Sequence, residues 1–254
     1  MRRLSHLLHE NLALYGGLGL FAFCTLLWSL LALPLRFILP VKVGRRLGRR
    51  AITRIFRIYL GSLSVLRVCR FDLSALDALR DQGPLLIAPN HPCLLDAFFV
   101  LSRLDNVACI LKAELLDNPF LGGGARLAGY IRNDTPRNMI LRAVDELGRG
   151  SHLLLFPEGT RTASWPLNPF QKSVGRIAQR AAVPVQTVFI DTDSAYLSKG
   201  WPLFRKPLRL PIRYRVRLGR RFDPPGEVNR FTAELRAYFE QELQTHPPLH
   251  TAEP

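Results

Sequence analysis

The sequence lacks the features that mark disulfide-stabilised, repetitive and disordered proteins. Only four of its 254 residues are cysteine, which is too few for a disulfide-stabilised secreted domain. Internal repeats and low-complexity linkers are absent, and a hydrophobic fraction of 48% excludes a disordered chain. The length therefore indicates one folded domain with an appended segment, in a reducing compartment.

Acidic residues are missing from two long stretches of the chain. Residues 11–71 hold ten basic residues and no Asp or Glu, and residues 194–222 hold nine basic residues and no acid. The remainder is slightly acidic, so the formal net charge of +15 belongs to these two stretches. This distribution predicts an anionic partner that meets particular surfaces of the protein.

The first basic stretch contains a long apolar run. Residues 12–33 carry no charge and are long enough to cross about 30 Å of hydrocarbon as a helix. Pro34 is expected to stop or kink this helix. Eight basic residues follow at 36–57, whereas Arg2 and Arg3 alone flank the other end. The positive-inside bias then places everything after residue 35 on the cytoplasmic side of the inner or plasma membrane.

Three interpretations of this segment are open. A secretory signal peptide is disfavoured by the length of the run and by the lack of an A-x-A-like cleavage site. A membrane-spanning anchor fits the length. In a half-inserted hairpin, the apolar helix and a basic amphipathic helix near residues 41–60 both lie in one leaflet. The last two interpretations both hold this end of the chain at an anionic membrane surface.

Short apolar runs alternate with helical patterns in the rest of the chain. Four runs predict buried strands and a fifth predicts a half-exposed strand with one arginine face: residues 84–89, 107–111, 151–156, 185–190 and 212–218. Helical patterns lie at residues 95–104, 136–147, 173–182 and 227–243. We therefore predict an α/β fold, with a mixed, mostly parallel sheet flanked by helices and an N-terminal membrane-embedded helical segment.

The expected organisation has three parts. Residues 1–60 form the anchoring segment with its basic flank, residues 61–245 form the globular domain, and residues 246–254 form a loose tail. Within the domain, residues 118–124 are predicted to be a flexible loop because they end in three consecutive glycines.

A histidine and an aspartate follow the predicted strand at 84–89. Inside one regular helix a separation of five residues rotates two side chains about 500° apart, so His91 and Asp96 would diverge. They can meet only if His91 lies in the turn before the helix, an arrangement that Pro92 favours. Asp96 would then hold one ring nitrogen and leave the other to take a proton from a hydroxyl. A purely structural His–Asp hydrogen bond is the alternative.

A second polar segment, Phe-Pro-Glu-Gly-Thr-Arg at residues 156–161, follows another predicted buried strand. Arg161 offers a planar fork for a phosphate, and Gly159 lets backbone approach a ligand closely. With Glu158 and Thr160, these residues suit an acceptor that carries both a hydroxyl and a phosphate. A turn with a surface Glu–Arg pair is the alternative.

Taken together, the two segments resemble the glycerophospholipid acyltransferase family. The N-H-x-x-x-x-D block of that family matches Asn90, His91 and Asp96, and its F-P-E-G-T-R block matches residues 156–161 without substitution. The resemblance covers roughly residues 84–190, and the apolar N-terminal segment fits the family's membrane helices.

The resemblance implies transfer of a fatty acyl group from a thioester, on CoA or acyl carrier protein, to a lysophospholipid hydroxyl, most simply that of 1-acyl-sn-glycerol-3-phosphate. His91 would be the general base and Asp96 its orienting partner. No metal and no organic cofactor are implied. The implied acceptor-binding residues are Glu158, Gly159, Thr160, Arg161, Lys112, Arg132, Arg137 and Lys172.

Two departures from the family pattern concern acceptor binding. Arg132 stands one place earlier than the arginine of the family's G-x-x-F-I-D-R block, and Arg137 is a candidate substitute. Lys172 stands one place later than the lysine of the family's F-K-x-G. A shift by one residue on a strand points a side chain to the opposite face. An acyltransferase of the same mechanism with a different lysolipid or lipid-like hydroxyl acceptor is therefore the alternative function.

Other residues with potential chemistry receive structural interpretations. Cys93 lies two positions after His91, which permits a Cys–His nucleophile, but we interpret it as a small residue lining the site. The other three cysteines lack metal-ligand spacing. The glycine triplet lacks the full dinucleotide-binding pattern, and Asp191 and Asp193 are interpreted as loop residues and not as a metal pair.

A basic protein that binds membranes or nucleic acid through charge alone is the competing, non-enzymatic function. No nucleic-acid motif accompanies the basic residues, and the first basic stretch adjoins the apolar run, as in membrane proteins. We therefore expect membrane lipids, an anionic bilayer surface and an acyl donor as partners, and no nucleic acid. Oligomeric state, acyl chain length and donor type stay open.

Overall fold

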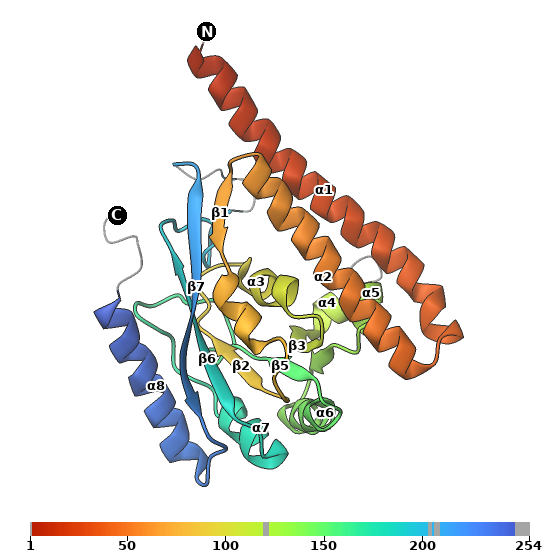
Figure 1. The fold of residues 1–254 in the computed structure, drawn as a ribbon, viewed down its shortest axis with the longest axis vertical. Helices are drawn as coiled ribbons and strands as arrows, with labels where there is room; N and C mark the ends of the chain where they lie inside the picture. Colours follow the sequence, from red (N-terminus) through yellow and green to blue (C-terminus); the bar gives the residue numbers. More distant parts are fainter. Residues whose placement is uncertain (1, 119–121, 203–204, 206–208, 247–254) are drawn as a thin grey trace.

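The computed structural model describes residues 2–118, 122–202, 205 and 209–246, and a seven-stranded sheet lies at its centre (Figure 1). Its strands are β1 Cys69–Asp72, β2 Leu86–Pro89, β3 Val107–Lys112, β4 Ile131–Asn133, β5 His152–Leu154, β6 Val185–Thr192 and β7 Ile212–Phe222. The strand order is β1-β7-β6-β2-β5-β3-β4. All neighbours pair in parallel except β6 and β7, which are antiparallel. The predicted mixed, mostly parallel sheet is confirmed.

Helices cover both faces of the sheet (Figure 1). They are α1 Arg2–Ile38, α2 Val41–Val65, η1 Ser74–Leu79 (a 3-10 helix), α3 Asp96–Arg103, α4 Ala113–Asp117, α5 Gly122–Leu127, α6 Pro136–Gly148, α7 Ser173–Ala181 and α8 Val228–Thr245. Side chains of a strand alternate between faces, so Ile87 of β2 joins one apolar cluster while Leu86 and Ala88 join the other. The first cluster includes side chains of α2 and α3, and the second those of α6, α7 and α8.

The elements predicted for the globular part are present, with ends within a few residues of those expected. The sequence pattern does not predict β1 and β4, which lie at the two edges of the sheet. With four and three residues, these strands are too short to show an alternating pattern. The division expected at residue 60 falls inside α2, and residues 247–254 of the expected tail lie outside the described residues.

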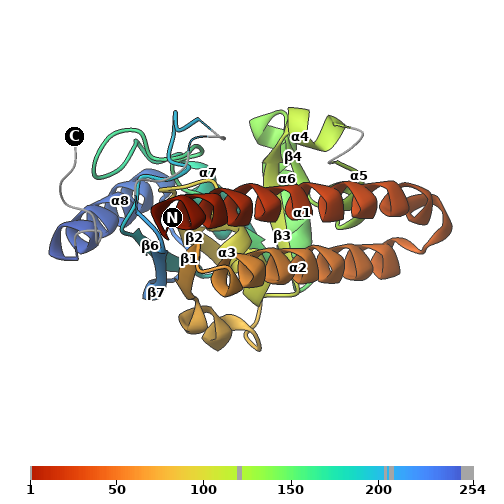
Figure 2. The same ribbon diagram turned by 90° about the horizontal axis from the view of Figure 1, so that it is seen from above.

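The two N-terminal helices form an antiparallel hairpin along one side of the globular part (Figures 1 and 2). The ring of Phe21 in α1 lies 5.9 Å from that of Phe56 and 4.7 Å from that of Tyr59, both in α2. Phe98 of α3 joins the same cluster, with its ring centroid 5.1 Å from that of Phe21. Aromatic packing therefore ties both helices of the hairpin to α3.

The apolar run is a helix, as predicted, but it does not stop at Pro34. It continues through this proline to its end at Ile38, because a proline removes a single backbone donor and the rest of the ladder is retained. Leu14–Ile38 is long and apolar enough to cross a membrane. Large apolar side chains on its outer surface are exposed, namely Leu20, Phe23, Leu26, Leu27, Leu30, Leu31 and Phe37. Both the spanning anchor and the half-inserted hairpin stay predictions.

The glycine triplet does not form the flexible loop expected from the sequence. Gly122, Gly123 and Gly124 are buried in the first turn of α5, which packs against α1. A Cβ atom at Gly123 would collide with the carbonyl oxygen of Ser29, and one at Gly124 with the ring of Trp28. Glycine is present here because the backbones of α1 and α5 approach too closely for any side chain.

A buried arginine holds the other helix of the hairpin against the domain. Arg49 of α2 donates to Glu146 Oε2 at 2.6 Å, to Ser151 Oγ at 2.6 Å and to the carbonyl oxygen of Ala128 at 3.0 Å. Arg45 forms a second ion pair with Glu146. Removing one partner of a buried ion pair leaves an uncompensated charge, so these contacts fix the position of α2.

We expect Gly123→Ala to weaken the docking of α1 and lower the free energy of unfolding by about 1–3 kcal/mol, because the backbones must separate to admit a methyl group. Gly61→Ala is the matched control, since a Cβ there meets nothing within 4 Å and alanine favours a helix. Thermal unfolding in detergent measures both. Equal stability of the two variants would contradict the close packing of α1 on α5.

Candidate active site

The turn that carries His91 is anchored to the neighbouring strand. Asn90, the residue after β2, is buried and forms two hydrogen bonds with Ile190 of β6. Its side-chain amide donates to the carbonyl oxygen of Ile190 at 3.1 Å, and its Oδ1 accepts from the Ile190 N–H at 2.7 Å. The chain therefore leaves β2 in a fixed direction, and His91 follows immediately.

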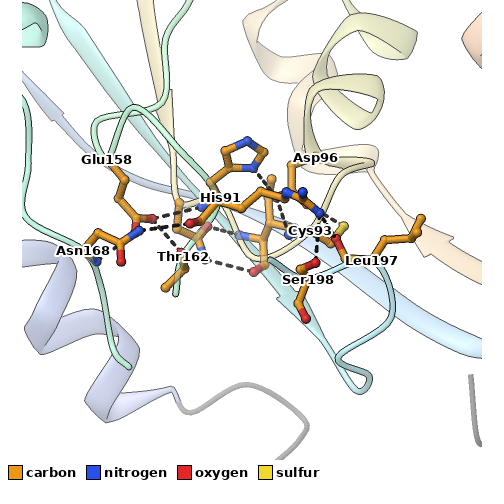
Figure 3. A network of polar contacts seen from close by, with 11 residues as sticks. His91, Cys93, Asp96, Glu158, Thr162, Asn168, Leu197 and Ser198 are labelled. Atoms are coloured by element: carbon orange, nitrogen blue, oxygen red, sulfur yellow. Dashed lines mark hydrogen bonds and ion pairs between the residues drawn. The ribbon is translucent and has the colours of Figure 1, made fainter. Parts of the chain in front are cut away.

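His91 and Asp96 meet in the way that the sequence analysis requires. His91 lies in the turn before α3, and Asp96 is the first residue of that helix. The distance from His91 Nδ1 to Asp96 Oδ2 is 2.8 Å (Figure 3). The aspartate is fully buried, whereas 16% of the histidine side chain is exposed. An ionised carboxylate only accepts, so Nδ1 carries the proton and Nε2 is left to accept one.

Three further contacts hold this pair. The ring of His91 stacks on that of Phe156, with centroids 3.8 Å apart and planes 15° from parallel. Asp96 accepts two hydrogen bonds from Cys93, one from its N–H at 2.8 Å and one from its thiol at 2.9 Å. The predicted pair therefore has a fixed ring plane and a fixed carboxylate.

The Phe156–Arg161 segment lies directly beside His91. The Thr162 N–H donates to the His91 carbonyl oxygen at 2.8 Å, and the His91 N–H donates to Glu158 Oε1 at 3.3 Å (Figure 3). Gly159 closes a tight turn, with its N–H 3.0 Å from the Phe156 carbonyl oxygen and a φ of 69° that favours glycine. The two sequence motifs therefore form one continuous site.

Glu158 accepts hydrogen bonds from within the chain, and its expected contact with the acceptor stays a prediction. Its carboxylate is buried and also accepts from Thr162 Oγ1 at 2.7 Å and from the Asn168 N–H at 2.8 Å. Burial raises the pKa of this carboxyl, and hydrogen bonds from Asn168, Thr162 and His91 oppose the shift. Both oxygens are therefore engaged by donors of the chain itself, in a network that holds the loop against His91.

Arg161 holds a third segment at the site. Its Nη1 donates to the carbonyl oxygens of Leu197 and Ser198, both at 2.9 Å (Figure 3). The Leu197 carbonyl oxygen also accepts from the Leu94 N–H at 3.1 Å, in the turn between His91 and α3. Part of the guanidinium is thus committed to positioning the loop after β6.

The remaining predicted acceptor ligands lie on several different elements. Lys112 is exposed at the carboxyl end of β3, and the parallel strands β2 and β5 end on the same side of the sheet. Arg132 of β4 pairs with Asp117 and lies 3.9 Å from Asp134. The other three are Thr160, half-buried in the turn, Lys172, exposed before α7, and Arg137, which lines a cavity of about 500 Å³ with Arg176 and Arg180. Their roles in acceptor binding stay predictions.

The described residues contain no group of three or more His, Cys, Asp or Glu side chains that could hold a metal ion. The four cysteines are free thiols, and three of them are buried.

Asn168 is a site residue that the sequence pattern does not identify. Its Oδ1 accepts from the Ala163 N–H at 3.1 Å, and its Nδ2 donates to the Arg161 carbonyl oxygen at 3.0 Å. A single asparagine in a loop carries no spacing signal that could have identified it.

The model of the acyltransferase family matches residues 70–191, which include both His91 and the Phe156–Arg161 turn. This segment is similar to the acyltransferase family and is just under half of the 254-residue chain. A crystal structure of the 1-acyl-sn-glycerophosphate (LPA) acyltransferase of Thermotoga maritima shares the fold, with a TM-score of 0.65 at 18% identity, and the match covers 100% of both chains.

The curated relatives of this chain share a low sequence identity with it. The 1-acyl-sn-glycerol-3-phosphate acyltransferase of Pseudomonas aeruginosa is 25% identical over 205 residues, which cover 78% of this chain and 77% of that protein. The lyso-ornithine lipid O-acyltransferase of Rhodobacter capsulatus is 31% identical over 143 residues, 53% of this chain and 48% of that protein. The relatives therefore agree on acyl transfer and differ in the acceptor that they are named for.

We expect Glu158→Gln to lower kcat about tenfold or more while leaving the KM for the acceptor nearly unchanged. An amide has one acceptor oxygen, so its NH2 group would face the Asn168 N–H and the loop would move away from His91. Steady-state kinetics measure the effect, with the surface variant Glu240→Gln as control. A rise in KM at constant kcat would instead indicate direct contact with the acceptor.

Proposed function

We propose that this protein is a membrane-bound O-acyltransferase that acylates the free hydroxyl of a lysophospholipid. The observation that carries the proposal is the 2.8 Å contact between His91 Nδ1 and the buried Asp96, beside the Phe156–Arg161 turn. A partly exposed imidazole with an orienting carboxylate is the arrangement that a general base requires. A protein that acts through its basic charge alone has no use for this pair.

The proposed reaction has two steps. Nε2 of His91 removes the proton of the acceptor hydroxyl as its oxygen attacks the thioester carbonyl carbon of the donor. The tetrahedral intermediate then collapses, its C–S bond breaks, and the new oxygen ester is released. The proton on His91 passes to the departing thiolate, so the base is regenerated. Asp96 keeps the imidazole in the correct tautomer and stabilises its positive charge between the two steps.

The acceptor proposed first is 1-acyl-sn-glycerol-3-phosphate, supported by the unsubstituted F-P-E-G-T-R turn and by the Pseudomonas aeruginosa relative. A second acceptor is a lysolipid whose headgroup is not a phosphate. It is supported by the contacts that the Arg132 and Arg161 side chains already make within the chain. Arg132 pairs with two aspartates, which offset its charge, and Nη1 of Arg161 already donates to two carbonyl oxygens, so fewer cationic donors are left for a phosphate. The donor is an acyl thioester of CoA or of acyl carrier protein, and no further cofactor takes part.

The hairpin of α1 and α2 supports a membrane location. The exposed apolar side chains of α1 suit the bilayer core, and exposed Val41, Val43 and Leu47 extend this surface onto α2. Lys42, Arg46, Arg50 and Arg54 are exposed on the same helix, where anionic headgroups would attract them. We infer that the globular part lies on the cytoplasmic face, from the excess of basic residues that follows the apolar run.

We expect His91→Ala to fold and to pellet with anionic vesicles but to lose about 10²–10⁴-fold in kcat, which is the range for removal of a general base. Release of thiol from an acyl thioester in the presence of a lysolipid measures the rate. His246→Ala, at the exposed end of α8, is the control. Near-normal turnover by the His91 variant would rule out the mechanism.

A panel of acceptors with a labelled acyl thioester, read out by the mass of the lipid product, tests the acceptor. We expect 1-acyl-sn-glycerol-3-phosphate to be acylated at least tenfold faster than lysolipids without a phosphate monoester, if Arg161 contributes a charge-assisted bond. The reverse preference would favour the second acceptor class while leaving the role of His91 intact.

A further inference from the structure

The site contains a buried thiol that the proposed steps do not use. Cys93 lies between His91 and Asp96 in the chain and is 1% exposed. Its N–H donates to Asp96 Oδ2, the oxygen that also faces His91. Its sulfur lies 2.9 Å from the other oxygen, Oδ1. The carboxylate is therefore held at both oxygens, and Cys93 contributes to both contacts.

The thiol is a donor and not a nucleophile in this environment. Burial raises the pKa of Cys93 well above its ordinary value, and the neighbouring charge of Asp96 raises it further. A thiol that stays protonated cannot attack a thioester, which removes the Cys–His nucleophile as an alternative. Its hydrogen is at the same time available to the carboxylate.

Tyr214 of β7 lies beside the thiol of Cys93. Its ring packs against those of Phe71 and Phe99, with centroids 5.6 and 5.0 Å away. Its buried hydroxyl is a neighbour of Cys93 and of Asp96, and a hydrogen bond from it to the sulfur opposes the rise in the pKa of the thiol. A phenol proton directed at the sulfur satisfies this hydroxyl and leaves the thiol hydrogen to Asp96.

We propose that Cys93 is a positioning residue for the reaction. The hydrogen bond from its S–H group to Oδ1 prevents rotation of the Asp96 carboxylate. Oδ2 therefore continues to face Nδ1 of His91, and Nε2 of His91 continues to face the acceptor hydroxyl. The inference rests on the proposed acyl transfer by His91 and adds a requirement to it: position 93 must carry a hydrogen-bond donor of small volume.

Serine and alanine at this position separate the positioning role from simple packing. If Cys93 only fills space beside the site, Cys93→Ala is tolerated and Cys93→Ser is worse, because serine buries an additional polar group. If Cys93 positions Asp96, the order is reversed, because serine keeps a donor and alanine loses it.

We expect Cys93→Ser to retain kcat within about threefold, and Cys93→Ala to lose about tenfold in kcat at unchanged KM for both substrates. Cys93→Thr provides a second hydroxyl donor if the serine variant is poorly folded. Cys109→Ala is the matched control, since Cys109 is also a buried thiol but lies in β3 with no contact to Asp96. Thermal unfolding in detergent shows that the compared variants are folded.

An NMR measurement on His91 and the activity of His91→Ala make each outcome decisive. The NMR signal of the His91 Nδ1 proton, assigned by its loss in His91→Ala, is expected to persist in the serine variant and to broaden or shift in the alanine variant. Alanine equal to or better than serine in kcat would overturn the positioning role. If His91→Ala is active, the proposed function itself fails, and if it is inactive while alanine is tolerated at position 93, only this inference fails.

Discussion

The buried carboxylate of Asp96 is the interaction on which the arrangement of the candidate active site depends. Removing a carboxylate from water costs several kcal/mol unless donors replace the solvent. Here His91 Nδ1, the Cys93 N–H and the Cys93 thiol all contact it, and its place in the first turn of α3 adds the positive end of a helix. The cost of burial is offset only when the turn before α3 has its observed shape, so the carboxylate determines where the imidazole lies.

A second constraint joins segments that are far apart in sequence. The backbone of His91 is bonded on both sides by the Phe156–Arg161 turn and its continuation, through Glu158 and the Thr162 N–H. Arg161 extends this network to the loop after β6. His91 is therefore positioned by contacts that link the loops after β2, β5 and β6, and these loops meet at the carboxyl ends of the strands, where open α/β sheets bind ligands.

The same helix that begins with Asp96 also contacts the N-terminal hairpin of α1 and α2. Phe98, two residues further along α3, stacks on Phe56 of α2 with ring centroids 4.2 Å apart and also packs on Phe21 of α1. Arg49 and the close approach of α5 to α1 add independent attachments. The apolar helices are therefore packed as part of the domain, and their orientation relative to His91 is set by side-chain packing. Under the proposed function, this packing fixes the site relative to the bilayer surface.

Local patterns along the chain are enough to predict the strands, the helices and the His91–Asp96 pair. Buried strands such as β2 are continuously apolar because both faces are covered, and the His91–Asp96 spacing allows one geometry in which the two residues meet. Features that depend on partners far away in the sequence became visible in the folded molecule alone. The glycine triplet became a packed helix because α1 lies against it, and Glu158 became an internal acceptor because donors from His91, Thr162 and Asn168 converge on it. The physical reason is that spacing along a chain limits contacts only between near neighbours, whereas burial and hydrogen bonding between segments depend on the assembled fold.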